Sequence, residues 1–280
     1  MARKQRAPRS PKTGDRISPR KQFGQHFLTD TNILQRIVNA AEIQSGDVVI
    51  EIGPGLGHLT RALLVAGARV VAIEIDPELA ARVSDELRDY TALTVLGGDF
   101  MKASPADWLA QAGLDGASYK VVANLPYYIT SAILRHLLET EQRPLLIVVM
   151  VQREVARQLT ARPDEMSMLA VSVQFYGDPE LVSIIPAGAF YPRPKVDSAI
   201  VRIRIRPTAR WPNVNARRFF GLARAGFGER RKQLRNALAR GLGLDPTEID
   251  LRLARAGLDP RRRAETLSME EWRQMYDQFA

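Results

Sequence analysis

The 280-residue sequence contains no cysteine, only 3 histidines and no long hydrophobic run. Without cysteine there can be no disulfide framework, no thiolate nucleophile and no cysteine-bound zinc, as is typical of a reducing compartment. Three scattered histidines argue against a metal site. The longest apolar run, 145–151, is far too short to cross a bilayer, and the first twenty residues lack the apolar segment of a secretory signal. We therefore expect a cytoplasmic protein with no bound metal and no membrane segment.

The basic charge is concentrated at the two ends of the chain. Residues 1–22 hold 8 Lys and Arg against 1 acid, residues 23–206 hold 17 against 21, and residues 207–280 hold 15 against 9. The net charge of +9 therefore belongs to the flanks of a mildly acidic middle. Such segregation favours a polyanionic partner, RNA or DNA, over tails that only aid solubility. The segment 1–22, rich in Pro, Ser and Arg, is predicted to be a disordered basic arm.

Five short apolar runs alternate with helical patterns in the first half of the chain. They lie at 48–53, 70–76, 93–99, 119–126 and 145–152. Continuous apolar strands separated by helices are typical of a parallel sheet covered on both faces, so the predicted fold is doubly wound α/β.

The second half begins with a helical pattern around 153–175, followed by two predicted strands, 180–187 and 198–207. The connection between these strands is too short for a helical crossover, so they should pair antiparallel. The last strand alternates apolar residues with arginine, which is typical of an edge or half-exposed strand. Beyond residue 213 only helical patterns remain. Prolines near 207–212 mark the boundary between a catalytic domain, 23–207, and a small all-helical domain, 208–280.

A glycine-rich turn, 53-GPGLG-57, follows the first predicted strand. Gly53 and Gly55 let the backbone pass close to a ligand, and Glu74, at the end of the next strand, can accept both hydroxyls of a ribose. The G-x-G-x-G spacing departs from the G-x-G-x-x-G pattern of dinucleotide-binding dehydrogenases. Together with the strand-end Glu and the later GGD, it resembles the S-adenosylmethionine site of Rossmann-like methyltransferases. That resemblance implies that Asp99 contacts the adenine amine of the cofactor, although an Asp at a strand end is also an ordinary helix N-cap.

The stretch 124-NLPYYIT-130 follows the fourth predicted strand, and ligands of open α/β sheets bind at such strand ends. One group that such a site could prepare for methylation is adenine N6. It is a poor nucleophile because its lone pair is delocalised into the ring, and its N–H is too weak an acid for a side-chain base to remove the proton. Two acceptors aimed at its hydrogens would draw the lone pair out of the ring plane. Asn124 Oδ1 and the Leu125 carbonyl, whose direction Pro126 fixes, fit this task, and Tyr127 can stack on the base. A proline turn with packed aromatic rings is the structural alternative.

These motifs resemble those of the bacterial small-subunit (16S) ribosomal RNA adenine N6,N6-dimethyltransferases, over residues 21 to about 272. KQFGQHFL at 21–28 is similar to the segment of that family that covers the cofactor, with His where many members have Asn. The resemblance implies an S-adenosylmethionine-dependent enzyme with a Rossmann-like catalytic domain. It assigns cofactor contacts to His26, Leu28, Gly53, Glu74, Asp99 and Asn124.

Two further motifs resemble this family. FYPRPKVDS at 190–198 is similar to the family loop F-x-P-x-P-x-V-x-S, which implies that Phe190 forms an aromatic clamp opposite Tyr127. GFGERRKQLRNAL at 226–238 is similar to the family helix A-F-x-Q-R-R-K-x-L-x-N-x-L, with Gly and Glu where most members have Ala and Gln. The resemblance implies RNA-phosphate contacts for the basic side chains of this helix, namely Arg230, Arg231, Lys232 and Arg235.

The resemblance also implies the substrate: two adjacent adenosines near the 3′ end of 16S rRNA, each dimethylated at N6 in an assembling 30S subunit by a monomeric enzyme. Two alternatives remain open at the level of sequence. One is a resistance-type methylase of large-subunit rRNA, and the other is an assembly factor that acts mainly by binding.

Overall fold

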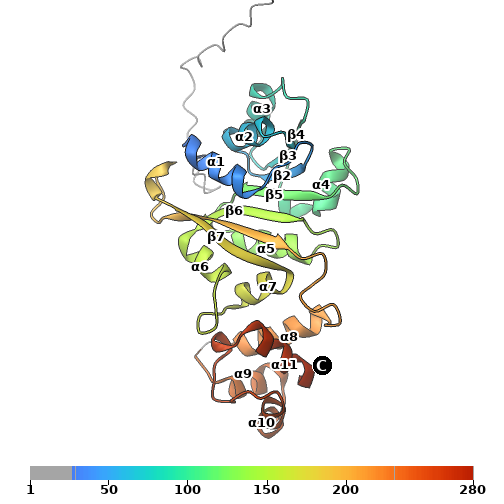
Figure 1. Cartoon of the computed structure of the whole chain (residues 1–280), viewed down its shortest axis with the longest axis vertical. Helices are drawn as coiled ribbons and strands as arrows, with labels where there is room; N and C mark the ends of the chain where they lie inside the picture. Colours follow the sequence, from blue (N-terminus) through green and yellow to red (C-terminus); the bar gives the residue numbers. More distant parts are fainter. Residues whose placement is uncertain (1–26, 29, 230, 280) are drawn as a thin grey trace, which may run out of the picture.

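A seven-stranded sheet forms the centre of the computed structural model, which describes residues 27–28, 30–229 and 231–279 (Figure 1). Its strand order is β4-β3-β2-β5-β6-β9-β7. Neighbours from β4 to β6 are parallel, whereas β9 is antiparallel to both β6 and β7. The predicted α/β fold with an antiparallel last strand is confirmed. The strands are β2 (Val48–Ile52), β3 (Arg69–Glu74), β4 (Leu93–Gly97), β5 (Tyr119–Asn124), β6 (Leu146–Gln152), β7 (Gly177–Ile185) and β9 (Ser198–Ile205).

Helices cover both faces of this sheet, which explains why its central strands are apolar throughout. Successive side chains of a strand point to opposite faces. Accordingly, Val49 and Val70 belong to the hydrophobic cluster of α1 to α3, while Ile50 and Val71 belong to the cluster of α4, α5 and α7. The helices are α1 (Thr31–Ala40), α2 (His58–Val65), α3 (Pro77–Glu86), α4 (Pro105–Gln111), α5 (Thr130–Glu139), α6 (Arg153–Leu159) and α7 (Met168–Tyr176).

The helix predicted around 153–175 is two helices, α6 and α7, separated by a loop. Pro163 lies in this loop, and the following Asp164 has a φ of 81°. Proline cannot donate the backbone hydrogen bond of a continuing helix. Ser167 then starts α7 by accepting a hydrogen bond from the Ala170 amide at 3.1 Å, as an N-cap does.

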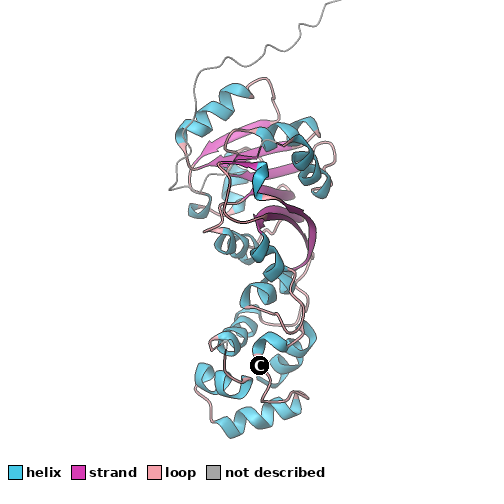
Figure 2. Ribbon diagram, turned by 90° about the vertical axis from the view of Figure 1, so that its left-hand side faces the viewer, coloured by secondary structure: helices cyan, strands magenta, loops and turns pink. Residues whose placement is uncertain are grey.

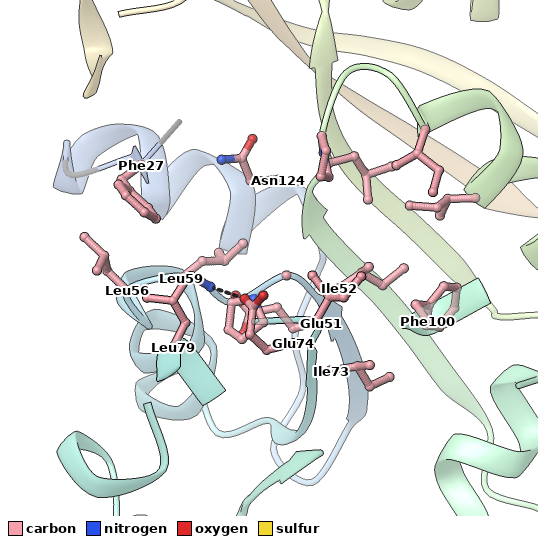
Figure 3. A pocket seen from close by; sticks show the side chains of 18 of the residues that line it. Phe27, Glu51, Ile52, Leu56, Leu59, Ile73, Glu74, Leu79, Phe100 and Asn124 are labelled. Carbon is pink, nitrogen blue, oxygen red and sulfur yellow. Dashed lines mark hydrogen bonds between the residues drawn. The ribbon is translucent and has the colours of Figure 1, made fainter. Parts of the chain in front are cut away.

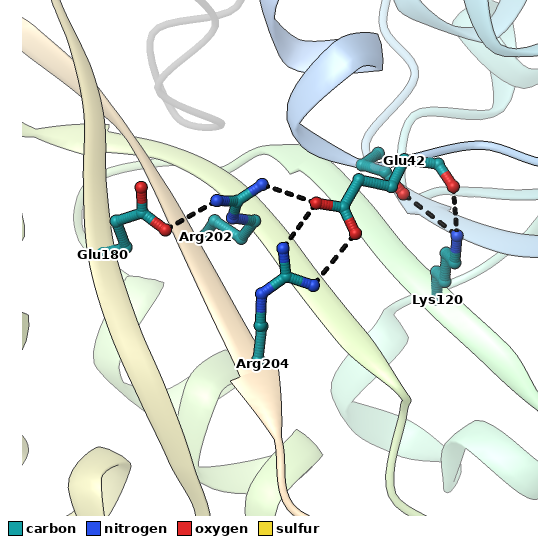
Figure 4. Close-up of polar contacts among 6 residues, drawn as sticks. Glu42, Lys120, Glu180, Arg202 and Arg204 are labelled. Carbon is teal, nitrogen blue, oxygen red and sulfur yellow. Dashed lines mark hydrogen bonds and ion pairs between the residues drawn. The ribbon is translucent and has the colours of Figure 1, made fainter.

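Of the two alternatives predicted for the arginine-rich strand β9, an edge strand and a half-exposed strand, the edge position is wrong. The strand lies between β6 and β7, and β7 is the edge strand. Its arginines pair with carboxylates: Arg202 and Arg204 both donate to Glu42, which follows α1 (Figure 4). The hydrogen bond from Arg204 is the main cause that lowers the pKa of Glu42. The alternation therefore indicates a half-exposed face that ties β9 to the end of α1.

Four helices follow the sheet: α8 (Ala216–Phe227), α9 (Leu234–Leu242), α10 (Pro246–Arg255) and α11 (Met269–Phe279). They form one end of an elongated molecule (Figure 2), after a connection that spans the predicted boundary. Phe175 of α7 stacks on Phe219 of α8 with ring centroids 4.8 Å apart. One hydrophobic cluster continues from the sheet into these helices. The all-helical end is confirmed, and it shares its core with the sheet region.

The segment 226–238 is not one helix as the sequence resemblance indicated. α8 ends at Phe227, a turn follows, and α9 begins at Leu234. A backbone hydrogen bond from Lys232 N to the Glu229 carbonyl, 2.9 Å long, closes the turn. The basic residues at 231 and 232 therefore lie in a connection between helices.

A small two-stranded sheet pairs β1 (Phe27–Leu28) with β8 (Phe190–Tyr191). The predicted basic arm, 1–22, lies outside the described residues. Within the part of the chain that the structure describes, no helix is long and apolar enough to span a membrane, and no cluster of His, Cys, Asp and Glu could hold a metal ion.

Candidate active site

A pocket lies at the carboxyl ends of β2 to β5, the side of a parallel sheet where ligands bind. Its wall combines the glycine turn after β2, the ends of β3 and β5, and the short strand β1. Figure 3 shows Glu51 close to Glu74, with Asn124 and Phe27 across the pocket. Residues predicted from four separate sequence motifs thus line one cavity.

The glycine turn has a left-handed backbone at both predicted positions. Gly53 has a φ of 69° and Gly55 a φ of 56°, values at which a Cβ is unfavourable. A Cβ on Gly55 would also lie 3.2 Å from the Phe27 ring. Because these two glycines have no side chains, space remains between the backbone of the turn and β1.

Glu74 joins this turn to the next loop. Its Oε2 accepts a hydrogen bond from Gly55 N and its Oε1 accepts one from Asp76 N, both 3.0 Å long. Burial raises the pKa of the Glu74 carboxyl, while these backbone donors oppose the shift. Each oxygen keeps a second lone pair, so the carboxylate can still accept hydroxyl groups from a ligand.

Glu51 is the buried carboxylate of the pocket, with 1% of its surface exposed. Its Oε2 and Thr60 Oγ1 have no hydrogen-bond partner among the described residues. Desolvation by burial raises the pKa of Glu51 to about 8; the neighbouring Thr60 opposes this shift, and repulsion from Glu74 adds to it. Such an unpartnered acceptor facing a cavity fits a ligand that brings a hydrogen-bond donor.

Replacing Glu51 with glutamine should stabilise the protein without bound ligand at alkaline pH. The folded state keeps the Glu51 proton up to about pH 8, whereas the ordinary glutamate value is 4.5. The folded state therefore binds more protons than the unfolded state between these values, and wild-type stability falls as pH rises through that window. Melting temperatures measured from pH 5 to pH 9 should diverge in favour of Glu51→Gln. The exposed Glu141→Gln serves as control, and parallel curves for wild type and Glu51→Gln would contradict the burial argument.

Leu28 lines the pocket from β1, and the cofactor contact that the resemblance implies for it stays a prediction. Its carbonyl oxygen lies 3.0 Å from His58 Nδ1, so the first residue of α2 anchors β1 against the glycine turn. The other predicted residue of this segment, His26, lies outside the described residues.

Asp99 lies at the pocket and also acts as a cap. Its Oδ1 accepts a hydrogen bond from Met101 N at 3.0 Å, which starts a short 3₁₀ turn, Phe100–Lys102. Among the described residues, Oδ2 has no such partner. The two roles considered for Asp99 from the sequence, an N-cap and a cofactor contact, are therefore compatible.

The stretch after β5 forms a tight turn at the pocket. Leu125 N donates to the Met150 carbonyl at 3.2 Å, and the Pro126 carbonyl accepts from Thr130 Oγ1 at 3.1 Å. The Leu125 carbonyl has no hydrogen-bond partner among the described residues. Asn124 ends β5 half-buried, in register with Met150. The turn therefore fixes the backbone at Asn124 and Leu125, both of which line the pocket.

Tyr127 is fixed by a hydrogen bond that sequence reasoning did not identify. Its hydroxyl lies 2.7 Å from Oγ of Ser198, a fully buried residue at the start of β9. Burial raises the pKa of Tyr127, so the phenol stays neutral. Because the hydroxyl is anchored, the ring has a defined orientation beside the pocket.

Phe190 is not brought to the pocket, so the clamp opposite Tyr127 is not formed in this structure. Phe190 pairs with Leu28 in the small sheet, is 5% exposed and packs in the hydrophobic cluster of α1 to α3. Since strand side chains alternate, the next residue, Tyr191, faces solvent with 70% of its surface exposed.

The predicted RNA-binding residues differ in their surroundings. Arg231 and Lys232 are exposed on the turn between α8 and α9, and no described carboxylate pairs with either. Glu229, the acid among these cations, faces Arg240 at 2.5 Å. Arg235 is half-buried with Nε 2.9 Å from Asp250 Oδ2, although the atoms are not aligned for a hydrogen bond. Arg230 lies outside the described residues.

Comparison with known proteins decides the family. The family model described as "Ribosomal RNA adenine dimethylase" matches residues 16–280. The chain belongs to the ribosomal RNA adenine dimethylase family. This confirms the predicted enzyme class, an S-adenosylmethionine-dependent ribosomal RNA adenine dimethyltransferase.

Relatives of this dimethylase cover nearly the whole chain. It is 49% identical to ribosomal RNA small subunit methyltransferase A of Dehalococcoides mccartyi strain 195, over 94% of the chain and 89% of that protein. The protein of the same name from Moorella thermoacetica is 46% identical, over 91% of each chain.

Two solved structures share the fold of this dimethylase. A dimethyladenosine transferase from Plasmodium falciparum has a TM-score of 0.76 at 26% identity, covering 89% of this chain and 96% of its own. The 23S rRNA methyltransferase ErmE has a TM-score of 0.72 at 29% identity, covering 90% and 98%.

Three residues of the site were not assigned a role from the sequence: Glu51, His58 and Ser198. A signal existed for two of them, because Glu51 begins the E-x-G-x-G-x-G motif and Ser198 ends the F-x-P-x-P-x-V-x-S loop. The contact between His58 and Leu28 joins residues 30 positions apart, and no local pattern indicates it.

Proposed function

We propose that this enzyme dimethylates N6 of two adjacent adenosines near the 3′ end of small-subunit ribosomal RNA, as a monomer acting on an assembling 30S subunit in the cytoplasm. The choice of the small subunit rests on the relatives named for it, which are 42–49% identical to this chain. The large-subunit enzyme ErmE is 29% identical. That difference favours the small-subunit substrate over the resistance-type alternative.

The pocket residues fit the methyl donor. The low glycine turn leaves room for it, Glu74 has free lone pairs for ribose hydroxyls, and the unpartnered Glu51 Oε2 fits a ligand N–H. Asp99 and the β1 segment at Leu28 complete the set of contacts. When bound, S-adenosylmethionine supplies an electrophilic methyl group on a sulfonium.

The residues after β5 prepare adenine N6 for attack. Asn124 Oδ1 and the Leu125 carbonyl accept the two N6 hydrogens, which draws the nitrogen toward tetrahedral geometry and directs its lone pair at the methyl group. The fixed Tyr127 ring stacks on the base. No general base is needed before transfer, so catalysis rests on orientation and electrostatics. The target nucleotide has to be unstacked to enter the pocket.

The turn between α8 and α9 is proposed to contact RNA phosphates within an RNA-binding helical region, 208–280. Replacing Arg231 and Lys232 with glutamine should weaken binding to small-subunit rRNA and lower the salt slope of log K by about 1.4 on single-stranded RNA. Binding measured across a potassium chloride series checks this. Arg240→Gln, which removes a cation already paired with Glu229, should change the slope less. An unchanged slope for the double variant would exclude this turn from the interface.

The function itself is tested with small subunits from cells that lack the gene. Purified protein and labelled S-adenosylmethionine should add four methyl groups per 16S rRNA, and mass spectrometry should map them to two adjacent adenosines near the 3′ end. Labelling of 23S rRNA instead would support the resistance-type alternative. Stable binding without methyl incorporation would support an assembly factor.

A further inference from the structure

We propose that exposed side chains around the mouth of the pocket form a track for single-stranded RNA, which holds the nucleotides on either side of the target adenosine. The track consists of Tyr128, Tyr191, Arg193 and Lys195. It rests on the proposed function, because it takes the occupant of the pocket to be an adenine in RNA.

Two exposed aromatic rings lie on segments next to the pocket, Tyr128 on the turn after β5 and Tyr191 on β8, which pairs with β1. Tyr128 follows the target-stacking Tyr127 and lines the pocket, yet 69% of its surface is exposed. Tyr191 is 70% exposed and lies in register with Phe27, which lines the pocket from the other side. An exposed ring offers a face on which any base can stack. Tyr128 therefore provides a stacking surface at the pocket itself, and Tyr191 provides one beside β1, which carries Phe27 and Leu28 to the pocket.

Two cations lie on the loop that connects β8 with β9. Arg193 and Lys195 are exposed, and no described carboxylate pairs with either. The acid of this loop, Asp197, is used elsewhere: its Oδ1 accepts a hydrogen bond from Ala187 N at 3.0 Å. The two charges are therefore available to phosphates next to the aromatic rings.

The track is held in place relative to the catalytic turn. Ser198, which ends the cationic loop, lies 2.7 Å from the Tyr127 hydroxyl. Backbone pairing with β1 fixes Tyr191 at the other end of the loop. Exposed aromatic rings together with unpaired cations are typical of surfaces that bind single strands. Single-stranded RNA fits better than a duplex, since the target base has to leave its stack.

The track can be tested by RNA binding of the full chain, independently of methyl transfer. The probe is a fluorescently labelled single-stranded oligoadenylate, measured by anisotropy across a salt series. The double variant Tyr128→Ala/Tyr191→Ala should bind about 30-fold more weakly with an unchanged salt slope. The double variant Tyr128→Phe/Tyr191→Phe keeps both stacking faces and should bind within about twofold of wild type.

The cations are tested with Arg193→Gln/Lys195→Gln, which should lower the salt slope of log K by about 1.4 because two phosphate contacts are lost. The control pair Arg69→Gln/Leu145→Ala removes an exposed cation and an exposed apolar side chain at the amino ends of the strands, opposite the pocket. Near-wild-type binding by Tyr128→Ala/Tyr191→Ala, or an unchanged salt slope for Arg193→Gln/Lys195→Gln, would contradict the proposed track. Failure of wild-type protein to methylate small-subunit rRNA would overturn the proposed function instead, while the binding results would still decide the track.

Discussion

Replacing Asn124 with alanine is expected to slow methyl transfer by about two to three orders of magnitude while RNA affinity stays within a few-fold of wild type. Asn124 Oδ1 is one of the two acceptors proposed to orient adenine N6, and no other described side chain stands at the end of β5 to replace it. The loss should appear in the single-turnover rate with saturating donor and RNA. The RNA contacts proposed for the turn between α8 and α9 do not depend on this amide.

The variant Asn124→Asp separates an orienting acceptor from a merely structural residue. It keeps an oxygen at the Oδ1 position and nearly the same volume, so its transfer rate should lie well above that of Asn124→Ala. Thermal melting of both variants controls for folding. Equal rates for the alanine variant and wild type would contradict the catalytic account, and equal losses for both variants together with lowered melting temperatures would indicate a structural role.

Replacing Glu74 with glutamine is expected to weaken donor binding by about 100-fold and to lower the unfolding free energy by about 1–3 kcal/mol. The carboxylate accepts from Gly55 N through one oxygen and from Asp76 N through the other. Glutamine has a single oxygen, so its NH₂ group would face one of these amide donors and leave it unsatisfied. The glycine turn would then lose its support at the place where the ribose is proposed to bind.

Calorimetric titration with S-adenosylhomocysteine and denaturant melts measure the two effects. Glu141→Gln, an exposed carboxylate in the loop after α5, is the matched control and should change neither quantity. Donor affinity that survives Glu74→Gln would contradict the donor contact proposed for this carboxylate.

The parts of the site that could be predicted from the sequence are those encoded in contiguous motifs at strand ends. Apolar runs indicated the parallel strands, and the carboxyl ends of such strands meet at one edge of the sheet. Glu74 and Asn124 therefore line the same pocket although 50 positions separate them in the sequence.

Non-local pairing accounts for what the sequence did not reveal. The insertion of β9 between β6 and β7, and the two-residue ladder that turns Phe190 inward, depend on partners far along the chain. Alternation of arginine along β9 does not specify that Glu42 will meet Arg202 and Arg204. Likewise, the basic motif at 226–238 contains no signal that a turn interrupts it after Phe227.

The most direct test of the central claim is a crystal structure of the enzyme with S-adenosylhomocysteine and an RNA that presents the target adenosine. The account predicts that N6 lies within hydrogen-bond distance of both Asn124 Oδ1 and the Leu125 carbonyl, with the base stacked on Tyr127. An adenine whose N6 contacts neither oxygen, with the Asn124 side chain directed away from the sulfur, would contradict it.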